Sequence, residues 1–215
     1  MLVLVVLGCA PLAPYHRAQA LGYGNWELGI ETGGTGNIAE RGGQGSPTLD
    51  VAFRYGVGEQ TDLGVRAGSS GVELVMKLGF TDPRYADVSV SIAPSASGAF
   101  VDTEELSTAY GALHAPVLVG IPLVEGHEVQ LAGGLLTHLQ GRPRDHDSLW
   151  SLGATAAVGY AWEATKEVTL LPQVAFYFPF VRSGDTTIGG PGAADLAMSG
   201  GLAVLVAPSP ERVAR

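Results

Sequence analysis

The sequence predicts an all-β fold: a single antiparallel up-and-down barrel of about ten strands that crosses a membrane. Apolar and polar residues alternate with period 2 in successive segments, as in strands, where neighbouring side chains point to opposite faces. The two arms of the clearest pair of segments, between Trp150 and Phe180, are each about as long as a membrane-crossing strand of roughly 9–11 residues, with aromatic residues at the ends of the apolar face. Charged residues make up only 15% of the chain, against about a quarter in a water-soluble domain.

The clearest signal is a hairpin between Trp150 and Phe180. Its first arm alternates strictly from Trp150 to Trp162 and its second from Val168 to Phe180, on either side of the polar break E-A-T-K-E. Aromatic residues stand at the ends of the apolar face, where a membrane strand places its aromatic girdle. The two arms therefore predict two neighbouring strands of a membrane barrel.

Eight more segments alternate in the same way. In chain order they are Gly24–Thr32, Thr48–Gly56, Thr61–Ala67, Val72–Phe80, Ala86–Ala93, Ala109–Ile121, Glu128–Leu139 and Leu196–Val206. No charged residue falls on the apolar face of any segment, although a face packed on a soluble core would be expected to carry one occasionally. Pro116 interrupts the sixth segment. Pro172 and Pro179 in the second hairpin arm indicate a bulge, because proline cannot donate to the sheet ladder.

Long Gly- and Asp-rich connections alternate with short ones, and only Gly68–Gly71 is short where a long loop is due. The long connections are Gly33–Pro47, Pro94–Thr108, Gln140–Ser148 and Val181–Ala194, and the short ones are Val57–Gln60, Thr81–Tyr85, Pro122–His127 and Glu163–Glu167. Outer-membrane barrels have short periplasmic turns and longer external loops, and an even number of strands brings both termini to the periplasm. The pattern predicts the same arrangement for this chain.

Each strand is predicted to turn its apolar face to lipid and its polar face to the lumen. The alternative is a soluble lipocalin-like barrel that binds a small ligand, in which the two faces are reversed. The polar face carries many small residues, such as Gly153, Ala157 and Gly201, and too few lysines and glutamates for a solvated surface. Small residues suit a narrow lumen, because they leave room for long side chains from the opposite wall. The membrane barrel is therefore the predicted architecture.

Charged residues on the polar faces form the candidate functional site. They are Glu27, Glu31, Asp50, Arg54, Asp62, Arg66, Glu73, Lys77, Asp87 and Glu128. In a lumen too small for bulk water, these side chains would form a network of ion pairs that fills it. Their acidic excess would instead suit a thin, cation-preferring water path. We expect the filled lumen, because ten strands give a bore only slightly wider than the eight-strand bore that side chains just fill.

The N-terminus is predicted to be a processing segment with two competing sites. Val6-Leu7-Gly8-Cys9 has the pattern of a lipobox, in which Cys9 is acylated and becomes the mature N-terminus. Ala18-Gln19-Ala20 is instead an A-x-A site for cleavage before Leu21. An unmodified cysteine within an ordinary signal is the third possibility. The predicted division of the chain is a processing segment (1–20), the barrel (23–207) and a periplasmic tail (208–215).

The opening G-C-A-P-L-A-P-Y-H-R-A-Q-A-L-G-Y-G-N-W-E-L-G resembles the start of small Gram-negative outer-membrane lipoproteins. In those proteins the barrel begins soon after the acylated cysteine. The resemblance implies a location in the bacterial outer membrane and a lipid on Cys9. It implies no particular activity, because those proteins mostly have none assigned.

Asp145-His146-Asp147, with His138 nearby, lies in a predicted external loop. A carboxylate beside a histidine at a barrel rim resembles the omptin proteases, which are also ten-stranded and use acidic and Asp–His pairs to activate water. The candidates for an opposing acidic pair form no recognisable motif; they are Asp102, Glu104, Glu105 and Asp185. As a divalent-metal site the cluster is equally unspecific. We therefore predict no enzymatic activity, no metal and no cofactor.

Composition excludes other classes of protein. A net charge of −9 without a basic cluster argues against nucleic-acid binding. The single cysteine excludes an internal disulfide framework. No run of roughly 18 apolar residues occurs beyond the N-terminus, so a helical membrane protein is excluded. The expected role is structural or surface-interaction, with outer-membrane lipid as one partner and a surface ligand at the long loops as another. The sequence does not specify the oligomeric state.

Overall fold

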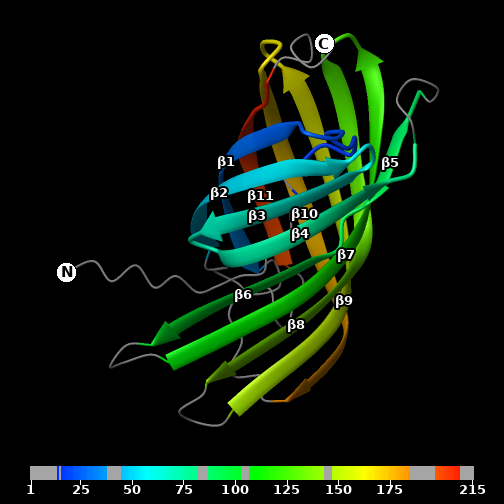
Figure 1. Cartoon of the computed structure of the whole chain (residues 1–215). Coiled ribbons are helices and arrows are strands. Elements are labelled where there is room, and N and C mark those ends of the chain that lie inside the picture. Colours follow the sequence, from blue (N-terminus) through cyan, green and yellow to red (C-terminus); the bar gives the residue numbers. More distant parts are fainter. Residues whose placement is uncertain are drawn as a thin grey trace.

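The computed structural model describes residue 14 and residues 16–37, 45–81, 87–102, 107–142, 147–184 and 197–208. These residues form one closed antiparallel β-barrel (Figure 1). In the described ranges the structure has no helix long and apolar enough to span a membrane.

Eleven strands occupy ten positions around the barrel. They are β1 (Trp26–Asn37), β2 (Gly45–Gly58), β3 (Thr61–Gly68), β4 (Gly71–Gly79), β5 (Ser89–Ile92), β6 (Ser95–Asp102), β7 (Ser107–Val124), β8 (His127–Arg142), β9 (Asp147–Glu163), β10 (Val168–Gly184) and β11 (Ala197–Val206). Consecutive strands pair as neighbours except β5 and β6, which share one position between β4 and β7, and β1 pairs with β11 to close the barrel. The predicted ten-stranded up-and-down barrel is therefore confirmed.

The shared position of β5 and β6 corrects the predicted loop Pro94–Thr108. Ser95–Asp102 pairs with both β4 and β7, so most of this segment is strand. Two hydrogen bonds carry the ladder across the break: Met76 N donates to Pro94 O (3.0 Å), and Ala93 N donates to Pro116 O (2.9 Å). The proline and the small polar residues around it are typical of a loop, but pairing on both sides holds them in the sheet.

Other strands also run further than their alternation suggests. β1 continues through the glycines of the predicted loop Gly33–Pro47, where each residue from Gly33 to Gly36 pairs with both β2 and β11. β10 continues to Gly184, and its register with β9 shifts between Pro179 and Val181, which is the predicted bulge. Pro172 keeps its register with β11. Glycine and proline weaken the alternation pattern without ending these strands, because both neighbours are paired.

The outward faces are apolar and the inward faces are polar. On β1 alone, Leu28 and Ile30 are 39% and 51% exposed, whereas Glu27 and Glu31 are 5% and 4% exposed. Other outward-facing apolar side chains are Phe53, Leu74, Leu113, Leu131, Leu135, Val158 and Phe178. A continuous apolar exterior around polar interior residues suits a bilayer and would be unstable in water. This distribution excludes the soluble lipocalin-like alternative.

The two ends of the barrel differ. At one end, which we call the terminal end, β1 begins, β11 finishes, and the turns at 59–60, 125–126 and 164–167 connect neighbouring strands. At the opposite end, which we call the loop end, β3 turns into β4 at 69–70. Inside, β1–β4 carry long charged side chains. By contrast, β9–β11 present mostly small or apolar side chains to the lumen, namely Ala161, Leu171, Ala175, Tyr177, Ala197, Ala203 and Leu205.

Candidate functional site in the barrel lumen

The charged residues of β1–β4 meet in the lumen because cross-strand register places them together. Glu27 lies opposite Arg54, Asp62 opposite Lys77, and Arg66 opposite Glu73. Side chains directly opposite on one face of an antiparallel pair lie within reach of each other, so alternation and register alone bring opposite charges into contact.

Arg54 connects the first group of charges. Its Nη2 lies 2.6 Å from Glu27 Oε1, and its Nη1 lies 3.4 Å from Asp62 Oδ2. Lys77 Nζ lies 3.0 Å from the same Asp62 oxygen. All four side chains are buried. Two cations therefore share one carboxylate inside the barrel.

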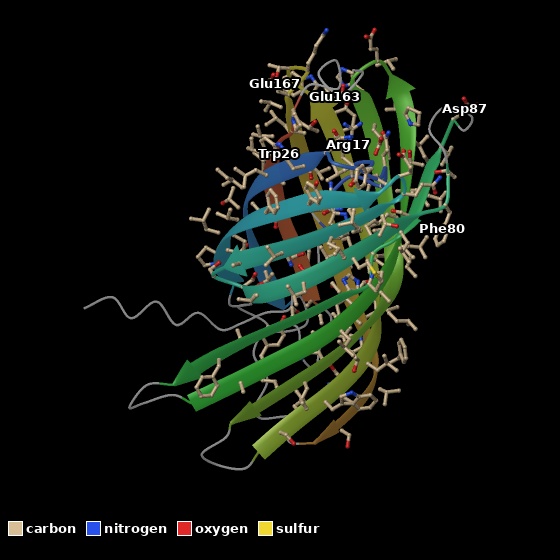
Figure 2. All side chains as sticks on the ribbon, viewed as in Figure 1. Arg17, Trp26, Phe80, Asp87, Glu163 and Glu167 are labelled. Carbon is tan, nitrogen blue, oxygen red and sulfur yellow. The ribbon has the colours of Figure 1, made fainter. Side chains whose placement is uncertain are left out.

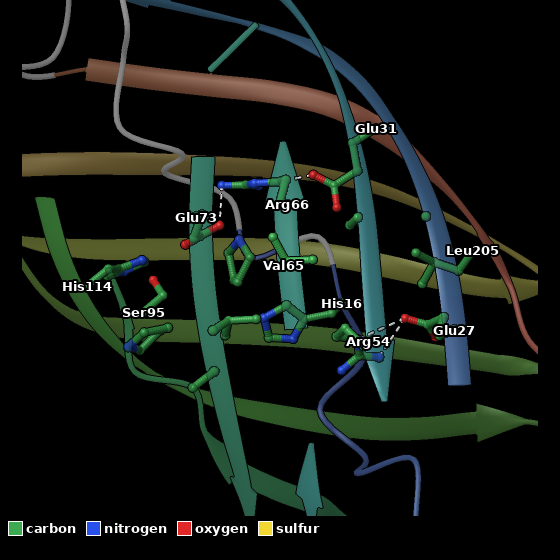
Figure 3. A pocket seen from close by; sticks show the side chains of 16 residues that line it. His16, Glu27, Glu31, Arg54, Val65, Arg66, Glu73, Ser95, His114 and Leu205 are labelled. Carbon is green, nitrogen blue, oxygen red and sulfur yellow. Dashed lines mark hydrogen bonds and ion pairs between the residues drawn. The ribbon is translucent and has the colours of Figure 1, made fainter. Parts of the chain in front are cut away.

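Arg66 connects the second group, closer to the loop end. Its Nη1 lies 3.0 Å from Glu31 Oε2 on β1, and its Nη2 lies 2.6 Å from Glu73 Oε2 on β4 (Figure 3). Arg66 lies opposite Ala52, and Ala52 lies opposite Gly29. These small residues of β2 and β1 leave space for the guanidinium to reach the Glu31 carboxylate.

The remaining predicted lumen residues have different surroundings. Asp50 accepts hydrogen bonds from the Ser70 backbone N (3.0 Å) and hydroxyl (2.6 Å), and so holds the β3–β4 turn. Glu128 accepts a hydrogen bond from Gln130 Nε2 (2.8 Å) and lies 3.6 Å from Arg17 Nη2. Both carboxylates are buried inside the barrel.

Asp87 is a correction to the predicted set. It is exposed and lies in the bend before β5, away from the lumen (Figure 2). The prediction placed it on a strand that began at Ala86, but β5 begins only at Ser89. A residue before the first paired position is not held to the inward face.

Residues 16–22, which we call the strap, run into the lumen from the terminal end, and no predicted lumen residue belongs to this segment. Arg17 of the strap lies 2.7 Å from Glu163 Oε1, between the lumen and the rim (Figure 2). Desolvation, and then the positive charges of Arg54 and Lys77, lower the pKa of His16 well below its ordinary value. Sequence reasoning missed the strap because a processing segment was expected there. Its one signal is that Arg17 is the sole charged residue before Glu27.

A cavity of about 30 Å³ lies between the strap and the two groups of charges. His16, Arg54, Arg66, Glu73 and His114 are among the residues that line it (Figure 3). This volume has room for one or two water molecules, far less than a continuous water column needs.

The lumen on the loop-end side is lined by neutral polar and aromatic groups. Tyr177 donates its hydroxyl hydrogen to Ser151 Oγ (3.0 Å), and His114 Nε2 lies 2.9 Å from Thr155 Oγ1. His138 is buried on β8, where its ring lies 5.0 Å from that of Tyr110 and neither ring nitrogen has a hydrogen-bond partner among the described residues. These buried side chains occupy the lumen beyond the charges.

The candidate catalytic cluster falls largely outside the described residues. Asp145 and His146 lie there, and so do Glu104, Glu105 and Asp185. β9 begins at Asp147 and β6 ends at Asp102, while His138 points into the lumen. In the described part of the chain, no group of three or more His, Cys, Asp or Glu residues is placed to hold a metal ion.

Comparison with known proteins finds likeness only in structure. No protein-family model matches the chain, and no curated protein matches it. Among solved structures, the chain is similar to the attachment invasion locus protein Ail of Yersinia pestis (TM-score 0.47, 7% identity, 86% of this chain and 99% of that chain). It is also similar to the outer membrane protease OmpT of Escherichia coli (TM-score 0.45, 10% identity, 85% and 95%). A third similar structure is Neisserial surface protein A (TM-score 0.43, 9% identity, 86% and 96%).

These TM-scores lie below 0.5, and the barrel itself indicates where the protein resides. Only helices and closed barrels can span a bilayer, because every backbone polar group must be paired within the protein. A closed antiparallel barrel with an apolar exterior and a polar interior is the architecture of the bacterial outer membrane. The chain is therefore an antiparallel β-barrel of the outer-membrane type.

Proposed function

We propose that this protein is a sealed, non-enzymatic outer-membrane barrel with a structural or surface-interaction role. The observation that carries the proposal is the pairing of the lumen charges. Each buried carboxylate of the predicted set has a cationic or hydrogen-bonding partner among the described residues. The pairs are Glu27–Arg54, Asp62–Lys77, Glu31–Arg66, Glu73–Arg66, Asp50–Ser70 and Glu128–Gln130.

Paired charges oppose conduction for a physical reason. A selective pore offers ligands that replace the hydration shell of the ion and then release it, so its charges must be accessible to the ion. Here the guanidinium nitrogens of Arg54 and Arg66 lie 2.6–3.4 Å from the carboxylate oxygens with which they pair. The adjoining cavity measures about 30 Å³. A cation could enter only by separating buried ion pairs, which is strongly unfavourable.

Function would then reside at the surface of the barrel. The outer-membrane lipid covers the apolar exterior, and a surface ligand would be met by the connections at the loop end. β1 begins and β11 ends at the end with short turns, which in outer-membrane barrels is the periplasmic end. A lipid on Cys9 would anchor the chain to the outer membrane. Cys9 itself lies outside the described residues.

The test is the conductance of the full chain in a planar lipid bilayer. Insertion is first established by the heat-dependent mobility of the folded barrel on a gel, and a porin of known conductance serves as the positive control. We expect no conductance steps from the inserted protein. Steady cation-selective steps that shrink in Glu73→Gln and Asp62→Asn would reject the sealed barrel and support the alternative, a narrow cation-preferring passive channel.

A further inference from the structure

The strap packs inside the barrel as part of its interior. Ala18 is 1% exposed and belongs to an apolar cluster with Ala93 and Leu118 of the barrel wall. Pro14 and His16 line the inner cavity, whereas Arg17, Gln19 and Ala20 line the pocket open to the terminal end. The strap therefore separates the interior from the terminal mouth.

The strap backbone completes the bonding of a buried lysine. Lys77 is 1% exposed, and its ammonium group has three hydrogens to donate. Its acceptors are Asp62 Oδ2 (3.0 Å), Arg17 O (3.0 Å) and Gln19 O (2.5 Å). Two of the three come from the strap, so without it a buried cation keeps one partner.

The strap also satisfies carboxylates of the wall. Leu21 N donates to Asp62 Oδ1 (3.0 Å). The Arg17 guanidinium pairs with Glu163 (2.7 Å) and approaches Glu128 (3.6 Å). These contacts tie the strap to β3 on one side of the barrel and to the neighbouring strands β8 and β9 on the other.

Two inward-facing glycines leave the space that the strap fills. A Cβ atom at Gly56 would overlap the carbonyl oxygen of Gly22. A Cβ atom at Gly120 would lie 3.1 Å from the Ala18 Cβ and 2.5 Å from Glu128 Oε1. The barrel wall therefore complements the strap both sterically, at these two glycines, and electrostatically, at Asp62, Lys77, Glu128 and Glu163.

We propose that the strap is a permanent part of the mature barrel, and that processing occurs upstream of Pro14 rather than after Ala20. Cleavage after Ala20 would remove Arg17, Ala18 and Gln19, and with them two acceptors of Lys77 and the cation facing Glu128 and Glu163. Of the two processing sites in the sequence, this favours the one at Cys9. The inference does not depend on whether the barrel conducts.

The first experiment is the intact mass of the protein purified from outer membranes after expression of the full chain in a Gram-negative host. We expect a mature chain that retains residues 14–20. A mature chain that starts at Leu21 would overturn the inference, whatever the bilayer recordings show. An added mass corresponding to acyl chains on Cys9 would in the same measurement support the lipid anchor.

The second experiment measures the coupling between Lys77 and the strap during refolding into lipid vesicles. Chains that start at Pro14 and at Leu21 are compared, each with and without Lys77→Met. We expect Lys77→Met to lower the denaturation midpoint clearly more in the longer chain, because only there does Nζ bond to the strap. Ser70→Ala, at the loop end, should have the same effect in both chains. Equal effects of Lys77→Met in both chains would show that the strap does not hold this lysine and would overturn the inference.

Discussion

Arg66 shows how single residues determine the state of the lumen. It lies between Glu31 and Glu73, with its guanidinium nitrogens 3.0 and 2.6 Å from their carboxylates. The Arg66, Glu31 and Glu73 side chains are only 6%, 5% and 14% exposed, so water screens these charges weakly. Burial of each charged carboxylate is therefore favourable only with the Arg66 guanidinium beside it.

Arg66→Met is expected to destabilise the folded barrel by about 3–5 kcal/mol, because it leaves two buried carboxylates without their cation. The measurement is the free energy of unfolding in vesicles from a denaturant titration followed by tryptophan fluorescence. The control adds Glu31→Gln and Glu73→Gln to Arg66→Met, which removes the uncompensated charge and should recover much of the loss. An unchanged free energy in the single variant would mean that water reaches these carboxylates and that the lumen is not sealed.

At the scale of elements, the β9–β10 pair depends on one close contact. Tyr177 of β10 is fully buried and lies over Gly153 of β9, where a Cβ atom would overlap the tyrosine ring and lie 2.5 Å from Phe178 O. The bulge between Pro179 and Val181 comes immediately after this contact along β10. A glycine on the inner face thus allows a large aromatic side chain to fill the bore.

Gly153→Ala is expected to destabilise the barrel by about 1–3 kcal/mol, because the Tyr177 ring must move and lose its bond to Ser151. Gly133→Ala on β8 is the matched control: its Cβ would have 3.7 Å to the nearest atom, so we expect a change within about 0.5 kcal/mol. Thermal unfolding followed by gel mobility compares the two. Equal midpoints for both variants would contradict the close contact.

At the scale of the whole molecule, the solvent on each side of the wall explains the orientation of every strand. Apolar side chains such as Leu28 and Leu135 are 39% and 56% exposed on the exterior, while charges such as Lys77 are buried inside. In water this arrangement would be unstable, whereas hydrocarbon on the outside makes it favourable.

Leu135→Arg tests this arrangement, since Leu135 is near the middle of β8 and faces outward. In a membrane barrel, arginine near the bilayer midplane is expected to cost about 2–4 kcal/mol of folding free energy. Folding into vesicles is measured for the variant and for Leu135→Ala, which separates loss of the leucine from gain of the charge. If arginine cost no more than alanine at this position, the exterior would face water.

Much of this fold could be predicted from alternation alone. Period 2 identifies which residues share a face, and the absence of charge on one face identifies lipid as its surroundings. The pattern fails where glycine and proline interrupt it, at Gly33–Gly36 and at Pro94, because there strand formation depends on pairing with both neighbours. Alternation also does not show where pairing begins. It places Asp87 in the lumen, although the first paired residue of β5 is Ser89.

The sequence by itself determined the class of fold, the faces of the strands and nine of the ten charges that it predicted for the lumen, because each depends on residue type at a fixed local spacing. Only the tertiary structure decided which charges meet, since register and small neighbours such as Ala52 determine the reach of Arg66. The tertiary structure alone also placed the strap inside the barrel. The strap belongs largely to the predicted processing segment, and its sequence has no periodicity that would predict burial. Its position follows from long-range contacts with Lys77, Asp62 and Glu163, which no local pattern encodes.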